Sequence, residues 1–218
     1  NLSIKEYGLS CDDAFAQTFI PDRNDVTKRL PIPTAHLRLI QKTCRSTDDD
    51  LRWLIALISD SGMRLAEAAG RLKADIQLDH EIPHVSLKPH AWRQLKTANS
   101  ERVIPLAGTS LWAARRILEC TDTEFAFPLF TNATRCNSNS ASATLNKWMK
   151  PLVPQGCVVH SFRHSLRDRL RAVETPSEIA DVLVGWTSKS IGQSYGKGYD
   201  LPVLQRWMKR LEEYSSSD

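Results

Sequence analysis

The stretch from His160 to Tyr199 holds side chains that could bind a phosphate group and attack it. His160 and Arg163 are three residues apart in a helix-like segment, so an imidazole and a guanidinium share one helix face. Trp186 follows a glycine, and Tyr195 lies with Tyr199 in a glycine-flanked loop. A guanidinium donates two parallel hydrogen bonds to phosphate oxygens, and a phenol can act as a nucleophile. The spacing therefore indicates phosphate chemistry.

Basic residues crowd the same predicted helix. Leu166 and Leu170 mark its buried side, and Asp168 relieves only part of the positive charge. Such a run is either a solvated face or a surface that meets nucleic-acid phosphates. The basic residues are His164, Arg167, Arg169 and Arg171.

Two cations earlier in the chain stand in unusual places. Arg64 begins a short helix-forming segment, 63–69, where its positive charge opposes the helix dipole. Either it is a solvated surface residue, or another group requires a guanidinium there. Lys96 lies near the tip of a polar segment between two predicted strands. A lysine there could reach into a cleft or could simply keep a sheet edge soluble.

The elements that must position these residues are mostly helices. Apolar residues recur at helical spacing, the acids at 48–50 favour a helix start, and Gly62 and Gly185 each favour a helix end. The predicted helices begin at Thr34, then run from about Thr47 to Gly62, Thr109 to Cys120, about Ala141 to Lys150, from about His160, from Pro176 to Gly185, and from Leu201 to about Tyr214.

A small sheet interrupts the helices. Residues 76–82 and 84–87 alternate or carry β-branched side chains, and 101–106 is a third strand that ends near Pro105. The fold class is therefore α+β, mainly helical, with a small antiparallel three-stranded sheet.

Composition excludes several classes of protein. With 218 residues, of which 41% are hydrophobic, the chain can bury a substantial core. Its five cysteines are odd in number and include no C-x-x-C pair, so we predict neither a disulfide framework nor a structural zinc site, and we expect a reducing cytoplasm. No apolar run is long enough to span a bilayer. A net charge of +4 permits a nucleic-acid partner without requiring one.

Three histidines, His80, His84 and His90, raise the question of a metal site. Their spacing fits neither H-E-x-x-H nor a zinc finger, and no cysteine or carboxylate completes a ligand set. We therefore predict no metal and no cofactor.

Taken in order, the motifs resemble the catalytic domain of the tyrosine recombinases, the phage integrase family. SGMRLAEAAG holds Arg64, LKTANSERVIPL holds Lys96, HSFRH holds His160 and Arg163, VGWTS holds Trp186 and QSYGKGY holds Tyr195. The resemblance covers roughly residues 31–214. It implies a tyrosine-recombinase catalytic fold and a site-specific recombinase or integrase of a mobile element, which acts on double-stranded DNA without metal or ATP.

The resemblance also implies the catalytic roles. Arg64 and Arg163 would clamp the phosphate in its phosphorane-like state, and Tyr195 would attack it to give a 3′-phosphotyrosine. His160 is the candidate proton acceptor, because a phenol of pKa near 10 is a poor nucleophile at neutral pH. Lys96 would protonate the leaving 5′-hydroxyl, and Trp186, where many relatives have histidine, would donate an N–H to the phosphate. Tyr199 is the alternative nucleophile, and Tyr214 is a weaker one.

The family pattern also suggests a domain organisation. The sequence begins without a methionine, and residues 1–30 have no sustained period, so we interpret them as a linker or arm from a missing N-terminal DNA-binding domain. Residues 31–218 would form the catalytic domain, located in the cytoplasm with the nucleoid. The C-terminal helix would pack either on its own domain or on another protomer of a recombination synapse.

Three other functions compete. A type IB topoisomerase shares the covalent chemistry, but the compact HSFRH motif and the interval from Trp186 to Tyr195 favour a recombinase. A catalytically decayed DNA-binding module would have lost some of the matched polar residues. A structural interaction domain leaves their co-occurrence unexplained. Among recombinases, integration or excision of a mobile element fits better than chromosome-dimer resolution.

Overall fold

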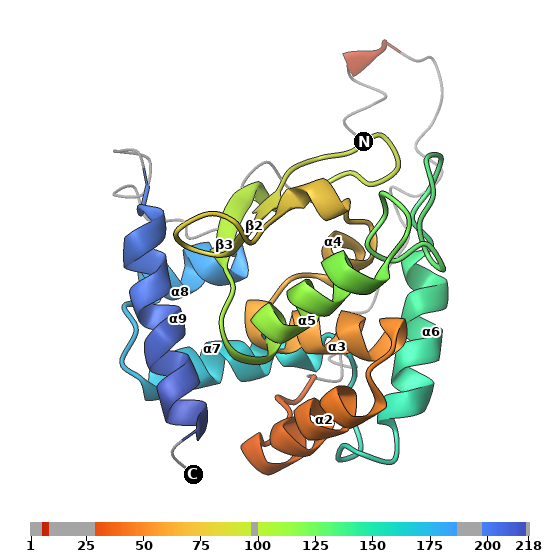
Figure 1. Ribbon diagram of the computed structural model, residues 1–218. Coiled ribbons are helices and arrows are strands. Elements are labelled where there is room, and N and C mark those ends of the chain that lie inside the picture. The colour runs from red at the N-terminus through yellow and green to blue at the C-terminus, as the bar shows by residue number, and fades with distance from the viewer. Residues whose placement is uncertain (1–5, 9–28, 97–99, 187–197, 217–218) are drawn as a thin grey trace.

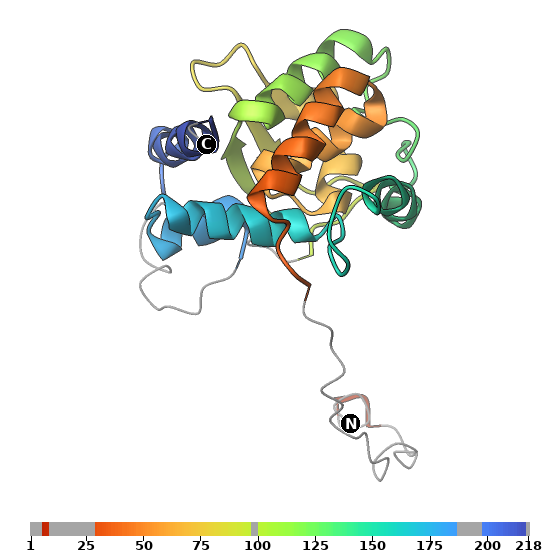
Figure 2. The same ribbon diagram turned by 90° about the horizontal axis from the view of Figure 1, so that it is seen from below.

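The computed structural model describes residues 6–8, 29–96, 100–186 and 198–216, and it is mainly helical with one small sheet. Figure 1 shows α3 near the middle, with α6 on one side and α9 on the other, and Figure 2 shows α7 crossing the domain below them. The elements are α2 (Thr34–Thr47), α3 (Asp50–Ser61), α4 (Leu65–Ala69), a 3-10 turn (Lys73–Asp75), β1 (Ile76–Gln77), β2 (His84–Leu87), β3 (Arg102–Pro105), α5 (Gly108–Cys120), α6 (Ser138–Met149), α7 (Ser161–Ala172), α8 (Ser177–Val184) and α9 (Leu201–Ser216).

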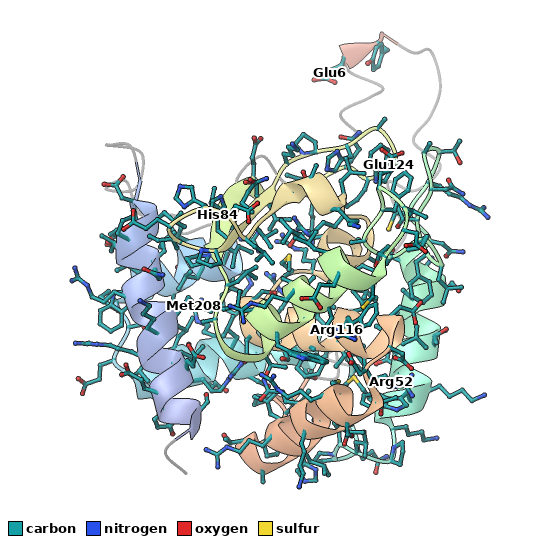
Figure 3. All side chains as sticks on the ribbon, in the orientation of Figure 1. Glu6, Arg52, His84, Arg116, Glu124 and Met208 are labelled. Carbon is teal, nitrogen blue, oxygen red and sulfur yellow. The ribbon has the colours of Figure 1, made fainter. Side chains whose placement is uncertain are left out.

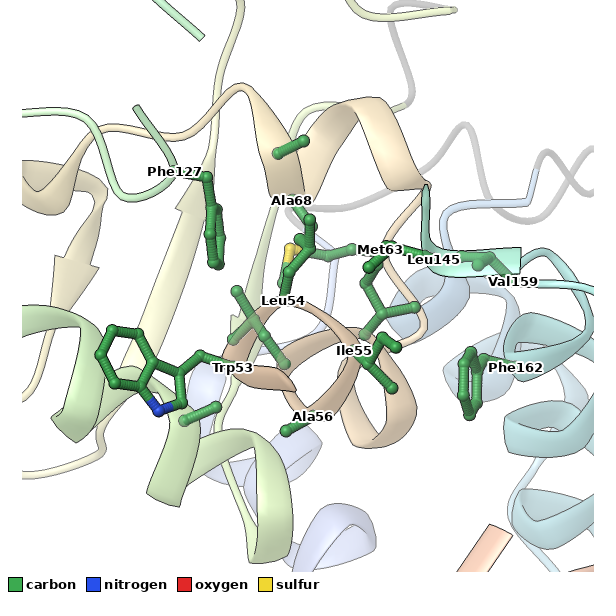
Figure 4. Packing of buried hydrophobic residues seen from close by; sticks show 14 of the residues in the cluster. Trp53, Leu54, Ile55, Ala56, Met63, Ala68, Phe127, Leu145, Val159 and Phe162 are labelled. Atoms are coloured by element: carbon green, nitrogen blue, oxygen red, sulfur yellow. The ribbon is translucent and has the colours of Figure 1, made fainter. Parts of the chain in front are cut away.

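The main core forms around α3. This helix contacts α2, α4, α5 and α7, and Leu54, Ile55 and Leu57 are each fully buried. A helix that is apolar on all sides can be stable in water only when other elements cover every face. Figure 4 shows Ile55 near Phe162 of α7, at the point where the helix that holds the predicted phosphate-binding residues meets this core.

Two apolar clusters meet along α7. Phe162 belongs to the main cluster, whereas Leu166 and Leu170 belong to a second one that they form with α8 and α9. Because both ends of α7 are buried against other helices, residues near its start have little freedom to move relative to α3.

The junction between α2 and α3 differs from the prediction. Thr47 ends α2 instead of starting α3, since Asp48 has a left-handed conformation (φ 51°) that stops the first helix. Asp49 then caps α3, and its Oδ1 accepts a hydrogen bond from the Arg52 backbone N–H at 3.0 Å. The predicted end of α3 at Gly62 is confirmed.

The three-stranded antiparallel sheet is confirmed, in the order β1-β2-β3, with Val85 paired to Ile76 on one side and to Ile104 on the other. The first strand is much shorter than the predicted 76–82. Its continuation folds into a turn, in which the Ile82 backbone N–H donates to His80 Nδ1 at 3.1 Å.

The arginines of α7 do not form one continuous surface. Arg169 belongs neither to a solvated face nor to a surface that could meet nucleic-acid phosphates. Its side chain is 5% exposed, and it forms an ion pair with Asp60 of α3 at 2.8 Å and donates to the Ser59 carbonyl at 2.6 Å. Asp60 also accepts from the Thr109 backbone N–H at the start of α5. A buried carboxylate therefore ties three helices together.

Replacing Arg169 with alanine should destabilise the fold strongly. Removing one partner of a buried ion pair leaves Asp60 as an unpaired buried charge, which typically costs about 3–5 kcal/mol. Arg171→Ala is the matched control, because Arg171 pairs with Asp168 on the exposed side of the same helix and such pairs contribute about 0–1 kcal/mol. Urea unfolding of both variants measures the difference, and equal losses would contradict the assignment.

The C-terminal helix α9 packs on its own domain in this structure. Leu204, Met208 and Leu211 are buried against α7, α8 and the Ala107 region, and α9 also contacts β3. In Figure 3, Met208 points from α9 toward the body of the domain. This is the intramolecular one of the two arrangements expected for the helix, and its docking on another protomer stays a prediction.

Candidate functional site

Arg64 is held at the start of α4 by three groups. Its Nη1 donates to Glu67 Oε1 at 2.6 Å and to Ser100 Oγ at 2.9 Å, and its Nη2 donates to the Gly185 carbonyl at 3.2 Å. Glu67 Oε2 also accepts from the Arg64 backbone N–H at 2.8 Å, so one carboxylate fixes both the backbone and the guanidinium. The alternative that Arg64 is a solvated surface residue is therefore wrong.

Glu67 is the negative charge that balances this arginine. Burial raises the pKa of its carboxyl, but the charge of Arg102 and the hydrogen bonds from Arg64 outweigh burial and hold the pKa below its ordinary value. The carboxylate is therefore ionised at neutral pH, and it holds Arg64 with a charge-assisted hydrogen bond.

Arg163 is almost completely buried, with 1% of its surface exposed. Its Nη1 donates to the Gly62 carbonyl, while its Nε makes no hydrogen bond to any described part of the chain. Burial, followed by the like charge of Arg64, lowers the pKa of Arg163 to about 9, and it stays charged at neutral pH. A buried guanidinium with an unpaired donor next to a second guanidinium favours binding of an anion.

Two glycines that end helices hold the two guanidiniums. Gly62 ends α3 at φ 62° and accepts from Arg163, and Gly185 ends α8 at φ 70° and accepts from Arg64. The carbonyls at a helix C-terminus carry partial negative charge and lack partners within the helix. Each cation therefore occupies a place where the helix dipole favours it.

His160 borders a pocket beside Arg163. The pocket has a volume of about 310 Å³ and is lined by Arg29 and by residues of α6 and α7. Burial is the largest cause that lowers the pKa of His160 to about 4, and the charges of Arg163 and Arg29 add to it. The imidazole is therefore neutral at pH 7 and can accept a proton. The remaining pocket residues are Met63, Leu65, Ser142, Asn146, Val158 and Val159.

The protein should lose stability in acid partly through His160. Its pKa falls from 6.5 to about 4 in the folded protein, so between these values the unfolded chain binds the proton more strongly. This contribution to stability is complete above pH 6.5 and is lost as the pH falls toward 4. The free energy of unfolding of wild type should therefore decline more steeply over this range than that of His160→Gln. Parallel declines in urea unfolding would contradict the shifted pKa.

Trp186 lies at the edge of the same cluster, directly after Gly185. The Arg167 guanidinium stacks over its ring at 4.2 Å and also pairs with Asp181 of α8. The centroid of the His164 ring lies 6.3 Å from that of the indole and 5.5 Å from that of the His160 ring. The structure thus brings Arg64, His160, Arg163 and Trp186 into one region: Arg64 binds the residue before Trp186, and the ring of His164 lies between those of His160 and Trp186. Their catalytic roles stay predictions.

Lys96 is exposed on the segment that joins β2 to β3 and is not packed into this cluster. It precedes Ser100 by four residues, and these span at most about 14 Å. Since Ser100 Oγ accepts from Arg64, the backbone at Lys96 is tethered near the cluster.

Tyr195 lies outside the residues that the structure describes. Tyr199, the alternative nucleophile, is described: its hydroxyl donates to Glu178 Oε2 at 2.7 Å, and this hydrogen bond is the main cause that raises its pKa. A raised pKa makes a phenol a weaker source of phenolate, which argues against Tyr199.

Three residues of the site escaped the sequence analysis. Glu67 could have been found as an acid three residues after Arg64 in the first turn of a helix. Ser100 and Arg102 carry no such signal, because they reach Arg64 and Glu67 through the tertiary fold.

The predicted absence of a metal remains a prediction. Among the described residues no group of three or more His, Cys, Asp and Glu side chains could hold a metal ion. His90 instead contacts Asp75 Oδ2 at 2.7 Å and stacks on Trp92, and His80 lies edge-on to His84.

The sequence model of the phage integrase family matches residues 34–200, which is more than half of the chain. The chain belongs to this family, that of the tyrosine recombinases. No curated protein matches the sequence. In the described part of the chain, no helix is both long and apolar enough to cross a membrane.

Solved structures share the fold at low sequence identity. The integrase from mycobacterium phage Brujita has a TM-score of 0.61 and 17% identity over 97% of this chain and 66% of its own. The Tn1549 transposon integrase, solved with a circular intermediate DNA, has a TM-score of 0.59 and 15% identity over 86% of this chain and 67% of its own. The XerH recombinase bound to difH has a TM-score of 0.52 and 16% identity over 94% of this chain and 58% of its own. The chain thus spans about two thirds or less of the length of each.

Proposed function

We propose that this chain is the catalytic part of a site-specific DNA recombinase of a mobile element. The observation that carries the proposal is the pair of guanidiniums, Arg64 and Arg163, with one unpaired buried donor next to a pocket. Planar forked donors match the oxygens of a phosphodiester, and they stabilise the extra charge that develops on those oxygens during attack. The similar folds of the Tn1549 integrase and the XerH recombinase, both solved with DNA, support the same conclusion.

The proposed reaction assigns one role to each residue. The Tyr195 phenol oxygen forms a bond to phosphorus, its proton passes to the neutral His160, and the bond from phosphorus to the 5′-oxygen breaks. Lys96 donates a proton to that leaving oxygen, and Trp186 supports the phosphate through its N–H. The 3′-phosphotyrosine conserves the energy of the phosphodiester, so a different 5′-hydroxyl can reverse the steps without ATP.

The remaining assignments follow from the family. We propose double-stranded DNA and further protomers in a synapse as partners, in the cytoplasm with the nucleoid. Residues 1–30 would link the catalytic domain, residues 31–218, to a separate DNA-binding domain. The proposed nucleophile, general acid and domain boundary stay predictions.

A covalent trap tests the function. The protein is incubated, without metal, with a pool of nicked duplexes whose central stretch is randomised, because strand loss at a nick prevents rejoining. DNA that stays attached through denaturing detergent is sequenced, and the modified peptide is mapped. We expect adducts on Tyr195 at a defined sequence.

Other outcomes distinguish the alternatives. Adducts without sequence preference, together with relaxation of supercoiled plasmid by the protein, would replace the recombinase by a type IB topoisomerase. DNA binding without any adduct would leave a catalytically decayed DNA-binding module.

A further inference from the structure

Arg102 lies on β3, within the motif that holds Lys96, but the sequence alone assigned it no role, and it is buried beside Arg64 and Glu67. Its side chain is 5% exposed. Its Nε donates to the Leu183 carbonyl at 3.2 Å, its Nη1 to the Ser100 carbonyl at 2.9 Å, and its Nη2 to Glu67 Oε2 at 3.4 Å. The three nitrogens therefore bind α8, α4 and the segment that leads into β3.

These contacts coincide with the groups that hold Arg64. Arg64 binds Glu67 through Oε1, whereas Arg102 binds the same carboxylate through Oε2. Arg64 binds the Ser100 hydroxyl, whereas Arg102 binds the Ser100 carbonyl. Arg64 donates its third hydrogen bond to the Gly185 carbonyl at the end of α8, and Arg102 packs so closely there that a Cβ on Gly185 would overlap its guanidinium.

We infer that Arg102 is a positioning residue, which fixes Arg64 for phosphate binding by holding Glu67, Ser100 and the end of α8 in place. The inference rests on the proposed function. The same contacts also hold the segments that carry two other predicted catalytic residues, because Trp186 follows Gly185 directly and Lys96 precedes Ser100 by four residues. One buried side chain thus connects the segments that contribute three of the predicted catalytic residues.

The geometry of arginine suits this role and that of lysine does not. A guanidinium presents fixed donors in three directions, whereas an ammonium is a single flexible point charge. Arg102→Lys should keep the charge beside Glu67 but lose contact with at least one of the two carbonyls. We therefore expect only partial activity from it.

The experiment uses the duplex that wild type captures from the nicked pool. Single-turnover cleavage, DNA dissociation constants and urea unfolding are measured for Arg102→Gln, Arg102→Lys and Arg169→Gln. Arg169 is the matched control, because it is also 5% exposed and paired with a buried carboxylate and a backbone carbonyl, yet it contacts none of the proposed catalytic residues. All rates are taken at a temperature where each variant is folded.

We expect Arg102→Gln to slow cleavage roughly 100-fold, because a displacement of about 1 Å at a reacting centre can cost this much, and to leave DNA affinity nearly unchanged. Arg169→Gln should lower stability but leave cleavage within a few-fold of wild type. If Arg102→Gln does not fold, Arg102→Lys provides the same comparison with a smaller expected loss.

A double-mutant cycle separates positioning from a general structural role. If Arg102 acts through Arg64, then Arg102→Gln should cost much less in an Arg64→Lys background than in wild type. The inference would be overturned if the two substitutions reduced the cleavage rate independently, so that the double variant lost the product of the two single losses. It would also be overturned by an Arg102 variant that cleaves as well as the Arg169 control. Failure of wild type to form any adduct would instead overturn the proposed function.

Discussion

Tyr195→Phe abolishes the covalent protein–DNA complex and leaves DNA affinity nearly unchanged: this is the largest effect that we expect. Phenylalanine lacks the oxygen that bonds to phosphorus, and loss of a nucleophile typically lowers the rate by more than about 10⁴-fold. The rest of the side chain is retained. A denaturing gel with labelled nicked duplex measures the complex, and fluorescence anisotropy measures the affinity.

Tyr199→Phe is the matched control for this prediction. Its phenol is hydrogen-bonded to Glu178, with the pKa raised, so its removal should change cleavage only a few-fold. An adduct that persists in Tyr195→Phe and maps to Tyr199 would reverse the assignment of the nucleophile.

Arg163→Ala should lower cleavage by about 10²–10³-fold, which corresponds to the loss of one preorganised donor, about 3–4 kcal/mol. Arg163 is buried and already charged before DNA binds, so its orientation requires little reorganisation during the reaction. Arg163→Lys should not restore the rate, because an ammonium cannot bind two phosphate oxygens in parallel. Single-turnover cleavage at saturating protein measures the effect.

One variant controls for the loss of a positive charge on the helix, and a second repeats the test on the other guanidinium. Arg171→Ala removes an exposed arginine from the same helix and should leave cleavage within a few-fold. Arg64→Ala should resemble Arg163→Ala, since both guanidiniums are proposed to bind the same phosphate. Cleavage at the wild-type rate in either Arg64→Ala or Arg163→Ala would refute the proposed clamp.

Local patterns predicted much of the fold. The helix ends at Gly62 and Gly185, the three strands and the apolar face of α9 could be inferred because each depends on residues that are close in sequence. The interval between His160 and Arg163 also depends on local helix geometry, so their proximity follows directly.

Long-range contacts could not be predicted in the same way. Arg169 belongs to a basic run that suggests a solvent-facing surface, yet its partner Asp60 lies on another helix. Ser100 and Arg102 come from a strand edge and contact Glu67 or Arg64 only because the sheet packs beside α4 and α8. Periodicity indicates which face of an element is buried, but it does not identify the polar group opposite.

Gly62 and Gly185 limit which substitutions the sequence can accept. Both have positive φ, and a Cβ would meet Leu166 at the first and the Arg102 guanidinium at the second. In a library of random substitutions selected for recombination, these two positions should tolerate as few replacements as the charged residues they hold. Selection for recombination would then retain these two glycines together with the residues that carry the chemistry.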